Sequence, residues 1–224
     1  MFYTEALFFT CMIFCFFSIY YKRHIALSLL IIPLVLLRPN GIILLIPMYL
    51  YFLERIGVLS KFKIDFALLF TKRIIYNSLA FLTGPITFSL FCVYQYSMTG
   101  YFFAFSIAQK GWYKEFMFPV LSFFRDSSFN NQFHSVYTII IIVYAFLIRK
   151  KLPISLNALI LLSLLFPLCS GSVLSMSRFI SSIFPMFIIL SSYLYNLKIK
   201  HTVLFVVLIL HLVSYRAWIL DIIN

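Results

Sequence analysis

Apolar residues fill long stretches of the chain, and short clusters of basic residues separate these stretches. Several stretches approach the roughly 20 residues that an α-helix needs to cross the ~30 Å hydrocarbon core of a bilayer. The apolar runs and the breakers between them predict eight membrane helices, over residues 3–21, 25–37, 41–58, 76–98, 133–148, 153–170, 178–197 and 202–220. We therefore expect an all-α fold in which residues 1–224 form a single transmembrane domain, a polytopic helical bundle.

The composition supports a membrane protein over a soluble one. Of the 224 residues, 63% are hydrophobic and 11% are charged, and the mean hydropathy is +1.04. Soluble domains are roughly 45–50% apolar, so this composition excludes a soluble enzyme or a globular binding domain. The cysteines lie in apolar stretches without a CxxC pair or a nearby His, which indicates neither a disulfide framework nor a metal or other cofactor: Cys11, Cys15, Cys92 and Cys169.

The formal charge of +12 reflects orientation in the membrane rather than a nucleic-acid partner, because most basic residues fall between predicted helices. One side of the predicted bundle, which we take as the inner side, holds Lys22, Arg23, Arg55, Lys61, Lys63, Lys72, Arg73, Arg149, Lys150, Lys151, Lys198 and Lys200. The other side holds Arg38, Lys110, Lys114, Arg125 and Arg178, and Arg216 falls in the last helix. Both termini are then expected to face outward.

The longest outer segment, residues 99–132, mixes aromatic residues with lysines. This mixture is typical of the headgroup level of a membrane, so we expect an interfacial helix within this outer (periplasmic or luminal) loop. The inner loop over residues 59–75 is amphipathic in the same way.

Arg38 is the first candidate for a functional charge in an apolar setting. It follows a predicted helix of about 13 residues, which spans only roughly 20 Å and falls short of the bilayer core. Arg38 is therefore predicted to lie below the outer surface beside a water-filled cavity, with Pro39 ending the helix and Asn40 capping the next one. The alternative is an arginine at a helix C-terminus whose side chain extends to the headgroups.

Other polar residues fall on the same predicted outer side. Arg178 opens the seventh helix beside Ser175 and Ser177, and hydroxyls, free N–H groups and a guanidinium together suit a phosphate, although such an arginine also suits lipid headgroups. Glu5 is either an acid lining a sugar site or a carboxylate favoured by a helix N-terminus. Gln109 and Trp112 could hydrogen-bond and stack on a sugar, and an aromatic belt at the membrane surface uses the same residue types.

Four segments, in order along the chain, carry a resemblance to a known family: Tyr3-Thr4-Glu5-Ala6-Leu7-Phe8; Leu37-Arg38-Pro39-Asn40-Gly41; Thr99-Gly100 with Ala104-Phe105 and Ala108-Gln109-Lys110-Gly111-Trp112; and Ser175-Met176-Ser177-Arg178-Phe179 with Phe184-Pro185. In these segments the chain resembles the PIG-V-like mannosyltransferases. These are membrane enzymes of the GT-C architecture that include the second mannosyltransferase of GPI-anchor synthesis and many bacterial relatives.

The resemblance implies inverting transfer of mannose, or a related sugar, from a polyprenyl- or dolichyl-phosphate carrier to an acceptor on the outer or luminal side. In such enzymes a carboxylate deprotonates the acceptor hydroxyl while cationic groups stabilise the departing lipid phosphate. The resemblance makes Arg38, Asn40, Gln109, Trp112 and Arg178 the candidate substrate-binding residues. It also implies a multi-pass protein of a bacterial inner membrane or, in a eukaryote, of the endoplasmic reticulum membrane.

The chain departs from the family pattern at two places. Tyr101 occupies the position where family members carry an acid after Thr-Gly. The family's catalytic Asp lies in a segment before the Tyr-Thr-Glu motif, and this chain begins at that motif, so Glu5 is the remaining candidate base. We therefore expect the C-terminal portion of a GT-C enzyme, from a truncated or split reading frame. It would be inactive alone and would need upstream helices or a separate N-terminal polypeptide, and an odd number of upstream helices would also explain the outward start.

Two other classes fit the composition. A small transporter or lipid-translocating bundle would use polar residues near the middle of the membrane, for which Gln95, Asn157 and His211 are the available points. A non-catalytic membrane subunit would explain the absent catalytic Asp directly.

Overall fold

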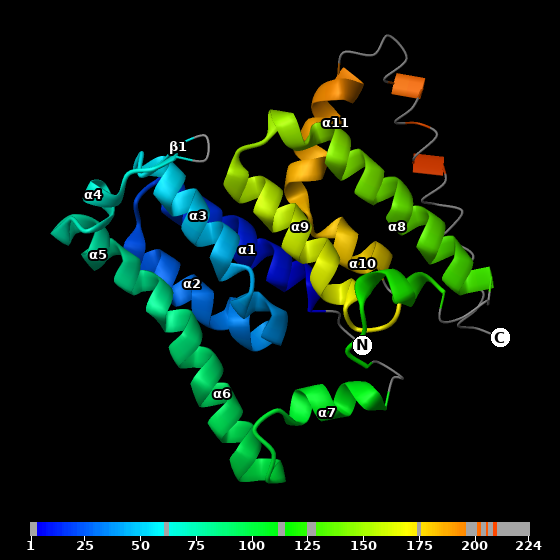
Figure 1. Cartoon of the computed structure of the whole chain (residues 1–224), viewed down its shortest axis with the longest axis horizontal. Helices are drawn as coiled ribbons and strands as arrows, with labels where there is room; N and C mark the ends of the chain where they lie inside the picture. The colour runs from blue at the N-terminus through cyan, green and yellow to red at the C-terminus, as the bar shows by residue number, and fades with distance from the viewer. Residues whose placement is uncertain are drawn as a thin grey trace. The chain divides into compact units, whose positions relative to one another are not determined.

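The computed structural model of the chain describes residues 4–60, 63–111, 115–124, 129–173 and 176–195, together with residues 201, 202, 205, 208 and 209. These residues are almost entirely helical, as Figure 1 shows, so the predicted all-α class is confirmed. The chain separates into two compact units, Met1–Phe184 and Pro185–Asn224. The candidate site lies in the first unit.

The first two helices form an antiparallel pair. Helix α1 spans Glu5–Tyr20 and α2 spans His24–Leu37, joined by a tight turn in which Lys22 has a φ of 58°. Each helix buries one face at helical spacing, which is why these apolar sequences form helices that pack together. The buried residues are Phe8, Cys11, Met12, Cys15, Phe16 and Ile19 on α1 and Leu27, Ile31, Leu34 and Val35 on α2.

A short 3₁₀-helix follows where a continuous third helix over 41–58 was predicted. Arg38 is extended, with φ −150° and ψ 127°, because the residue before a proline is disfavoured in the α conformation. Pro39 then opens η1 (Pro39–Ile42), and α3 begins only at Leu45 and ends at Arg55. The interruption separates Arg38 and Asn40 from the regular helices on both sides.

The segment after α3 contains the one pair of strands among the described residues. Strands β1 (Leu59–Ser60) and β2 (Lys63–Ile64) pair antiparallel, with Leu59 opposite Ile64. The carboxylate of Asp65 then accepts hydrogen bonds from the N–H groups of Ala67 and Leu68 and caps the short helix α4 (Phe66–Leu69). This hairpin was not predicted, because two-residue strands leave no periodicity in a sequence.

Two long helical segments come next. Helices α5 (Lys72–Ser78), η2 (Leu79–Leu82) and α6 (Thr83–Thr99) run on without a break, until Gly100, with a φ of 76°, ends α6. Helices α7 (Ala104–Lys110) and η3 (Pro119–Phe123) lie in the predicted outer loop. Helix α8 (Phe129–Ile148) continues into η4 (Arg149–Lys151). The helix expected in the outer loop is α7, and its location at a membrane surface stays a prediction.

The remaining helices are α9 (Ile154–Leu168), α10 (Met176–Ser181) and α11 (Phe184–Tyr195). The predicted seventh helix, 178–197, is thus two helices with a break after Ser181. Pro185 lies in the first turn of α11, where its missing N–H costs no helical hydrogen bond, so the proline starts a helix here. Most of the predicted helix 202–220 lies outside the described residues.

By length and composition, two described segments can cross a membrane, Lys72–Thr99 and Gln132–Lys151. Four shorter apolar helices accompany them, over Glu5–Tyr20, His24–Leu37, Ile154–Leu168 and Phe184–Tyr195. The structure therefore agrees with membrane association, while eight membrane crossings stay a prediction.

The helices of the first unit define two opposite ends, which we call the Arg38 end and the Arg55 end. At the Arg38 end, the start of α1 meets the end of α2 through Glu5 and Arg38. At the Arg55 end, the end of α3 meets the end of α1, where the Arg55 guanidinium lies 4.2 Å from the centre of the Tyr20 ring. Because α2 has 14 residues, the two ends are about 21 Å apart along this helix.

Helix α9 connects the same two ends and lies beside α3 (Figure 1). Its first turn is at the Arg55 end, because the Glu54 carboxylate accepts hydrogen bonds from both the N–H and the hydroxyl of Ser155. Its last turn is joined to the outer loop, since Ser122 Oγ donates to the carbonyl of Leu168 at 2.6 Å. The predicted inner and outer loops therefore meet opposite ends of this packed unit.

Candidate functional site at the Arg38 end

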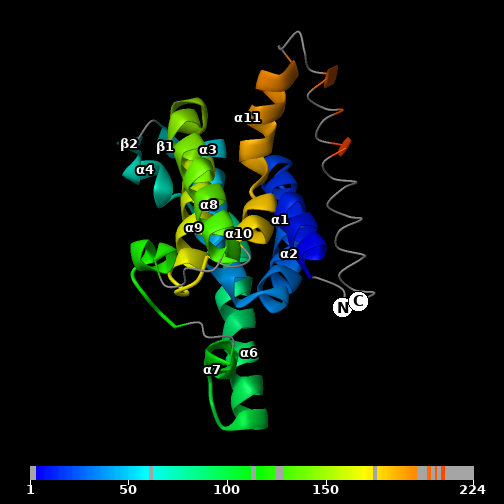
Figure 2. The ribbon, with the colours of Figure 1, turned by 90° about the vertical axis from the view of Figure 1, so that its right-hand side faces the viewer.

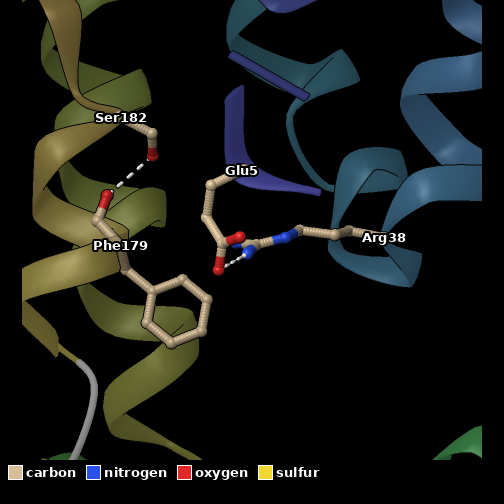
Figure 3. A network of polar contacts seen from close by, with 4 residues as sticks. All are labelled: Glu5, Arg38, Phe179 and Ser182. Carbon is tan, nitrogen blue, oxygen red and sulfur yellow. Dashed lines mark hydrogen bonds and ion pairs between the residues drawn. The ribbon is translucent and has the colours of Figure 1, made fainter. Parts of the chain in front are cut away.

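Arg38 is held by one carboxylate and two aromatic rings. Its Nη2 lies 2.5 Å from Oε1 of Glu5, and its guanidinium carbon lies 5.5 Å from the centre of the Phe8 ring and 5.2 Å from that of Phe179. Figure 3 shows Glu5, Arg38 and Phe179 converging from three separate segments. The side chains of Arg38 and Glu5 are only 17% and 20% exposed, so the pair is largely shielded from solvent.

The local sequence explains this convergence. Glu5 is the first residue of α1, where a carboxylate is also favoured by the positive end of the helix dipole. Phe8 is one turn further along α1 and therefore points to the same side. Arg38 leaves α2 in an extended conformation imposed by Pro39, and the antiparallel packing of α1 and α2 brings it to Glu5.

Helix α10 closes the arrangement from the other side. Phe179 stacks on Arg38, and the hydroxyl of Ser182 donates to the Phe179 carbonyl at 2.7 Å, at the end of α10 (Figure 3). Arg178 is the residue before Phe179 and belongs to the backbone of α10, but its side chain lies outside the described part of the structure. The structure thus brings the Arg178 segment next to Arg38, and substrate binding by either arginine stays a prediction.

A small cavity adjoins the ion pair. It has a volume of about 30 Å³, and Arg38, Asn40, Ser163, Phe179 and Ser182 contribute to its lining. A cavity of this size has room for a water molecule. Arg38 therefore lines a cavity, whereas water in this cavity and the position of Arg38 below the outer surface stay predictions.

The geometry differs from that of an arginine that extends to lipid headgroups. Arg38 turns toward Glu5 and the two rings instead of toward the surface. A charge removed from water costs several kcal/mol unless it is paired, so Glu5 is needed to hold Arg38 in this position. The rings add cation–π attraction, which is strongest where water is excluded. Together these contacts keep a guanidinium at the Arg38 end.

The outer-loop candidates are held by a different part of the unit. Gln109 is exposed on α7, and α7 is fixed to α6 by a 3.0 Å hydrogen bond from the Phe105 N–H to Oε1 of Gln95. Figure 2 shows α7 beside the C-terminal half of α6. In the described residues no contact joins Gln109 to Arg38, and Trp112 lies outside them.

Two members of the site were not singled out in the sequence. Phe8 and Phe179 lie inside the motif segments but carry no charge, and only the fold shows that their rings enclose Arg38. A pattern signal did exist for Phe8, which is three residues after Glu5 and so shares its helix face.

No protein-family model, curated protein or solved structure matches the chain.

Proposed function

We propose that the chain is a multi-pass membrane protein that forms the lipid-phosphate side of a glycosyltransferase site similar to that of the PIG-V-like mannosyltransferases. Its two longest apolar segments support the membrane part of this proposal. Only 22% and 17% of the most apolar windows of Lys72–Thr99 and Gln132–Lys151 are buried. A core helix of a soluble protein would be mostly buried, whereas exposed apolar faces of this size suit contact with lipid.

The separation of charge along the unit supports the same conclusion. Lys22, Arg55 and Arg73 gather at the Arg55 end, and the Arg149–Lys151 cluster immediately precedes α9, which starts at that end. Arg38 and the outer loop are at the other end. This is the distribution that the excess of Lys and Arg in cytoplasmic loops predicts for a protein that spans the membrane several times.

One observation carries the functional part of the proposal: three of the four motif segments, although far apart in the sequence, meet around the Arg38 guanidinium. They contribute Glu5 and Phe8, Arg38 and Asn40, and Phe179. If these residues only stabilised their own helices, we would not expect them to converge on one charged group. A guanidinium held at one end of a membrane unit is suited to the phosphate of a polyprenyl- or dolichyl-phosphate sugar.

Glu5 then acts as an internal counter-ion of Arg38. Its carboxylate is paired with the guanidinium, and the donor phosphate would replace the carboxylate on binding. Arg38 would stabilise the charge that develops on the lipid phosphate when the sugar leaves, which is the usual task of a cation at such a site. Glu5 faces Arg38 and not an open acceptor cavity, so the chain alone is expected to bind donor without transferring sugar.

The transporter alternative has weaker support in the described residues. The side-chain nitrogen of Asn157 donates to the carbonyls of Arg149, Leu152 and Pro153, and Gln95 accepts from the Phe105 N–H. Both amides therefore bind backbone groups, although Asn157 also lines a cavity of about 1200 Å³ between α3, α8 and α9. His211 lies outside the described residues.

The proposal predicts opposite effects of neutralising the two members of the ion pair on lipid-phosphate binding. With the chain in neutral-lipid nanodiscs, Arg38→Gln should weaken binding of a polyprenyl phosphate by about 1.5–3 kcal/mol, roughly 10- to 150-fold. Glu5→Gln should tighten binding, because Arg38 loses its competing carboxylate. Arg23→Gln, an exposed arginine near the other end of α2, is the control and should change nothing. Equal binding by all four proteins would reject Arg38 as the phosphate-binding residue.

A further inference from the structure

Another cavity lies at the Arg55 end, opposite to the candidate site. It has a volume of about 600 Å³ and is formed by the α1–α2 turn, the start of α2, the end of α3 and the segment from α4 to α5. Small-molecule sites are commonly about 300–1,000 Å³, so this cavity is large enough for a phosphate-bearing group. Its apolar lining consists of Ile19, Phe52, Ile56, Leu68 and Ile74.

The polar lining of this cavity is basic. Lys22, His24, Arg55 and Arg73 face it together with Thr71 and Asn77, and no carboxylate belongs to the lining. Within the part of the chain that the structure describes, none of the four basic side chains takes part in an ion pair. Four nitrogen bases around one cavity repel each other when protonated, which favours an anion between them.

Two of these side chains are fixed in place before any ligand arrives. The Arg55 guanidinium lies 4.2 Å from the centre of the Tyr20 ring, which orients its flat donor group. The His24 ring meets Phe52 edge-on at 6.1 Å, and its Nδ1 is buried without a hydrogen-bond partner among the described residues. A buried polar atom without a partner is uncommon in native proteins, which makes Nδ1 a candidate for contact with a ligand in this cavity.

The start of α2 adds to the positive potential. His24 is the first residue of this 14-residue helix, and no side chain caps its free N–H groups. The N-terminus of such a helix carries a partial positive charge and binds anions, phosphate above all. Tetrahedral phosphate can accept hydrogen bonds from several directions, as this arrangement of a helix end, two guanidiniums, an amine and an imidazole requires.

We propose that this cavity binds a phosphate group at the membrane face opposite to Arg38, carried by an anionic phospholipid or present as free phosphate. Basic pockets between helices at the cytoplasmic face are suited to such headgroups, and the apolar lining would accept the start of an acyl chain. The inference uses the membrane location of the chain but not the glycosyltransferase reaction. It is tested with a ligand that carries no sugar, so its failure would leave the role of Arg38 untouched.

The test measures binding to the purified chain in a neutral detergent by native mass spectrometry and by thermal stabilisation. The probes are dioleoyl-phosphatidylglycerol, dioleoyl-phosphatidylcholine and inorganic phosphate. Arg73→Gln and Arg55→Gln should each weaken phosphatidylglycerol binding about tenfold, the effect of losing one charged hydrogen bond. Lys72→Gln is the matched control, because it removes the same charge one residue from Arg73 but does not line the cavity. It should change binding less than twofold.

The probes separate the two sources of phosphate. Binding of phosphatidylglycerol that inorganic phosphate does not displace assigns the cavity to a lipid headgroup, and saturable binding of inorganic phosphate alone assigns it to the free anion. Either result supports the phosphate site only if Arg55→Gln and Arg73→Gln weaken the observed binding. Equal losses in Lys72→Gln and Arg73→Gln, or equal binding of phosphatidylcholine and phosphatidylglycerol, would overturn the proposal. Unchanged binding in both arginine variants would overturn it as well, and circular dichroism checks that each variant is folded.

Discussion

Arg38 shows how one side chain can be retained in an apolar environment. Its guanidinium is 17% exposed, contacts a carboxylate that is 20% exposed, and lies near two phenylalanine rings. Removing either partner of a buried ion pair leaves an uncompensated charge and costs about 3–5 kcal/mol, whereas replacing both partners costs far less. Each charge of the pair therefore contributes to stability mainly by compensating the other. This coupling between the two side chains can be measured.

A double-mutant cycle provides that test. Arg38→Gln and Glu5→Gln should each lower the free energy of unfolding by about 3 kcal/mol. The double variant should lose about 1–3 kcal/mol less than the sum of the two single losses, because the charges interact directly. Arg38→Lys should lie between the parent and Arg38→Gln, since an amine keeps the charge but lacks the flat group that stacks on Phe8 and Phe179. Thermal unfolding in detergent measures these values, and strictly additive losses would disprove the coupling.

The sequence indicated Arg38 as a candidate because this charge follows a predicted helix of about 13 residues, which is too short to cross the bilayer core. It did not predict the pairing with Glu5. That contact depends on the antiparallel packing of α1 and α2, a long-range property that no local pattern contains. The hydrogen bonds from Ser155 on α9 to the Glu54 carboxylate on α3 were not predicted for the same reason.

At the scale of helices and turns, the break after α2 is what presents Arg38 to the site. The chain turns back through η1, and Gly41 is buried where η1 crosses the end of α2. A Cβ atom on Gly41 would overlap the Leu34 carbonyl, with the Leu34 carbonyl carbon only 2.9 Å away. Because the obstacle is backbone, a rotamer change cannot relieve it.

We therefore expect Gly41→Ala to destabilise the protein by about 3 kcal/mol, the upper range for overpacking a core. It should also weaken polyprenyl phosphate binding, because η1 could no longer hold Arg38 against α1. Gly111→Ala is the control: Gly111 has ordinary helical angles, and an added Cβ would come no closer than 3.3 Å to the Ala108 carbonyl. A Gly41→Ala protein as stable as the Gly111→Ala protein would contradict the close approach.

The sequence predicted most helices to within a few residues, since long apolar runs bounded by basic residues determine α1, α2 and α9. It missed the breaks. The third predicted helix begins late, after η1, and the seventh separates into α10 and α11. Pro185 starts α11 inside one continuous apolar run, and hydropathy averaged over a window does not register a single missing N–H. The turn η1 after Pro39 is likewise much shorter than such a window.

At the scale of the whole molecule, the proposed function places the two ends of one packed unit at the two sides of a membrane. The Arg38 end contains a guanidinium paired with Glu5, and the Arg55 end contains a basic cavity without a carboxylate. Basic residues in the sequence predicted this separation, because their distribution between loops alternates with each helix. The sequence could not predict that the separated charges would converge on particular cavities, which requires the packing of α1, α2, α3 and α9.

Accessibility of single cysteines in intact cells tests the membrane arrangement most directly. Gln109 in α7 and Ser60 in β1 are both exposed, and they lie in the predicted outer and inner loops. Gln109→Cys should react with a membrane-impermeant maleimide in intact cells, and Ser60→Cys should react only after the membrane is permeabilised. The parent protein measures background labelling of Cys11, Cys15, Cys92 and Cys169. The reverse labelling, or labelling of both positions from outside, would contradict a chain whose Arg38 and Arg55 ends face opposite sides of the membrane.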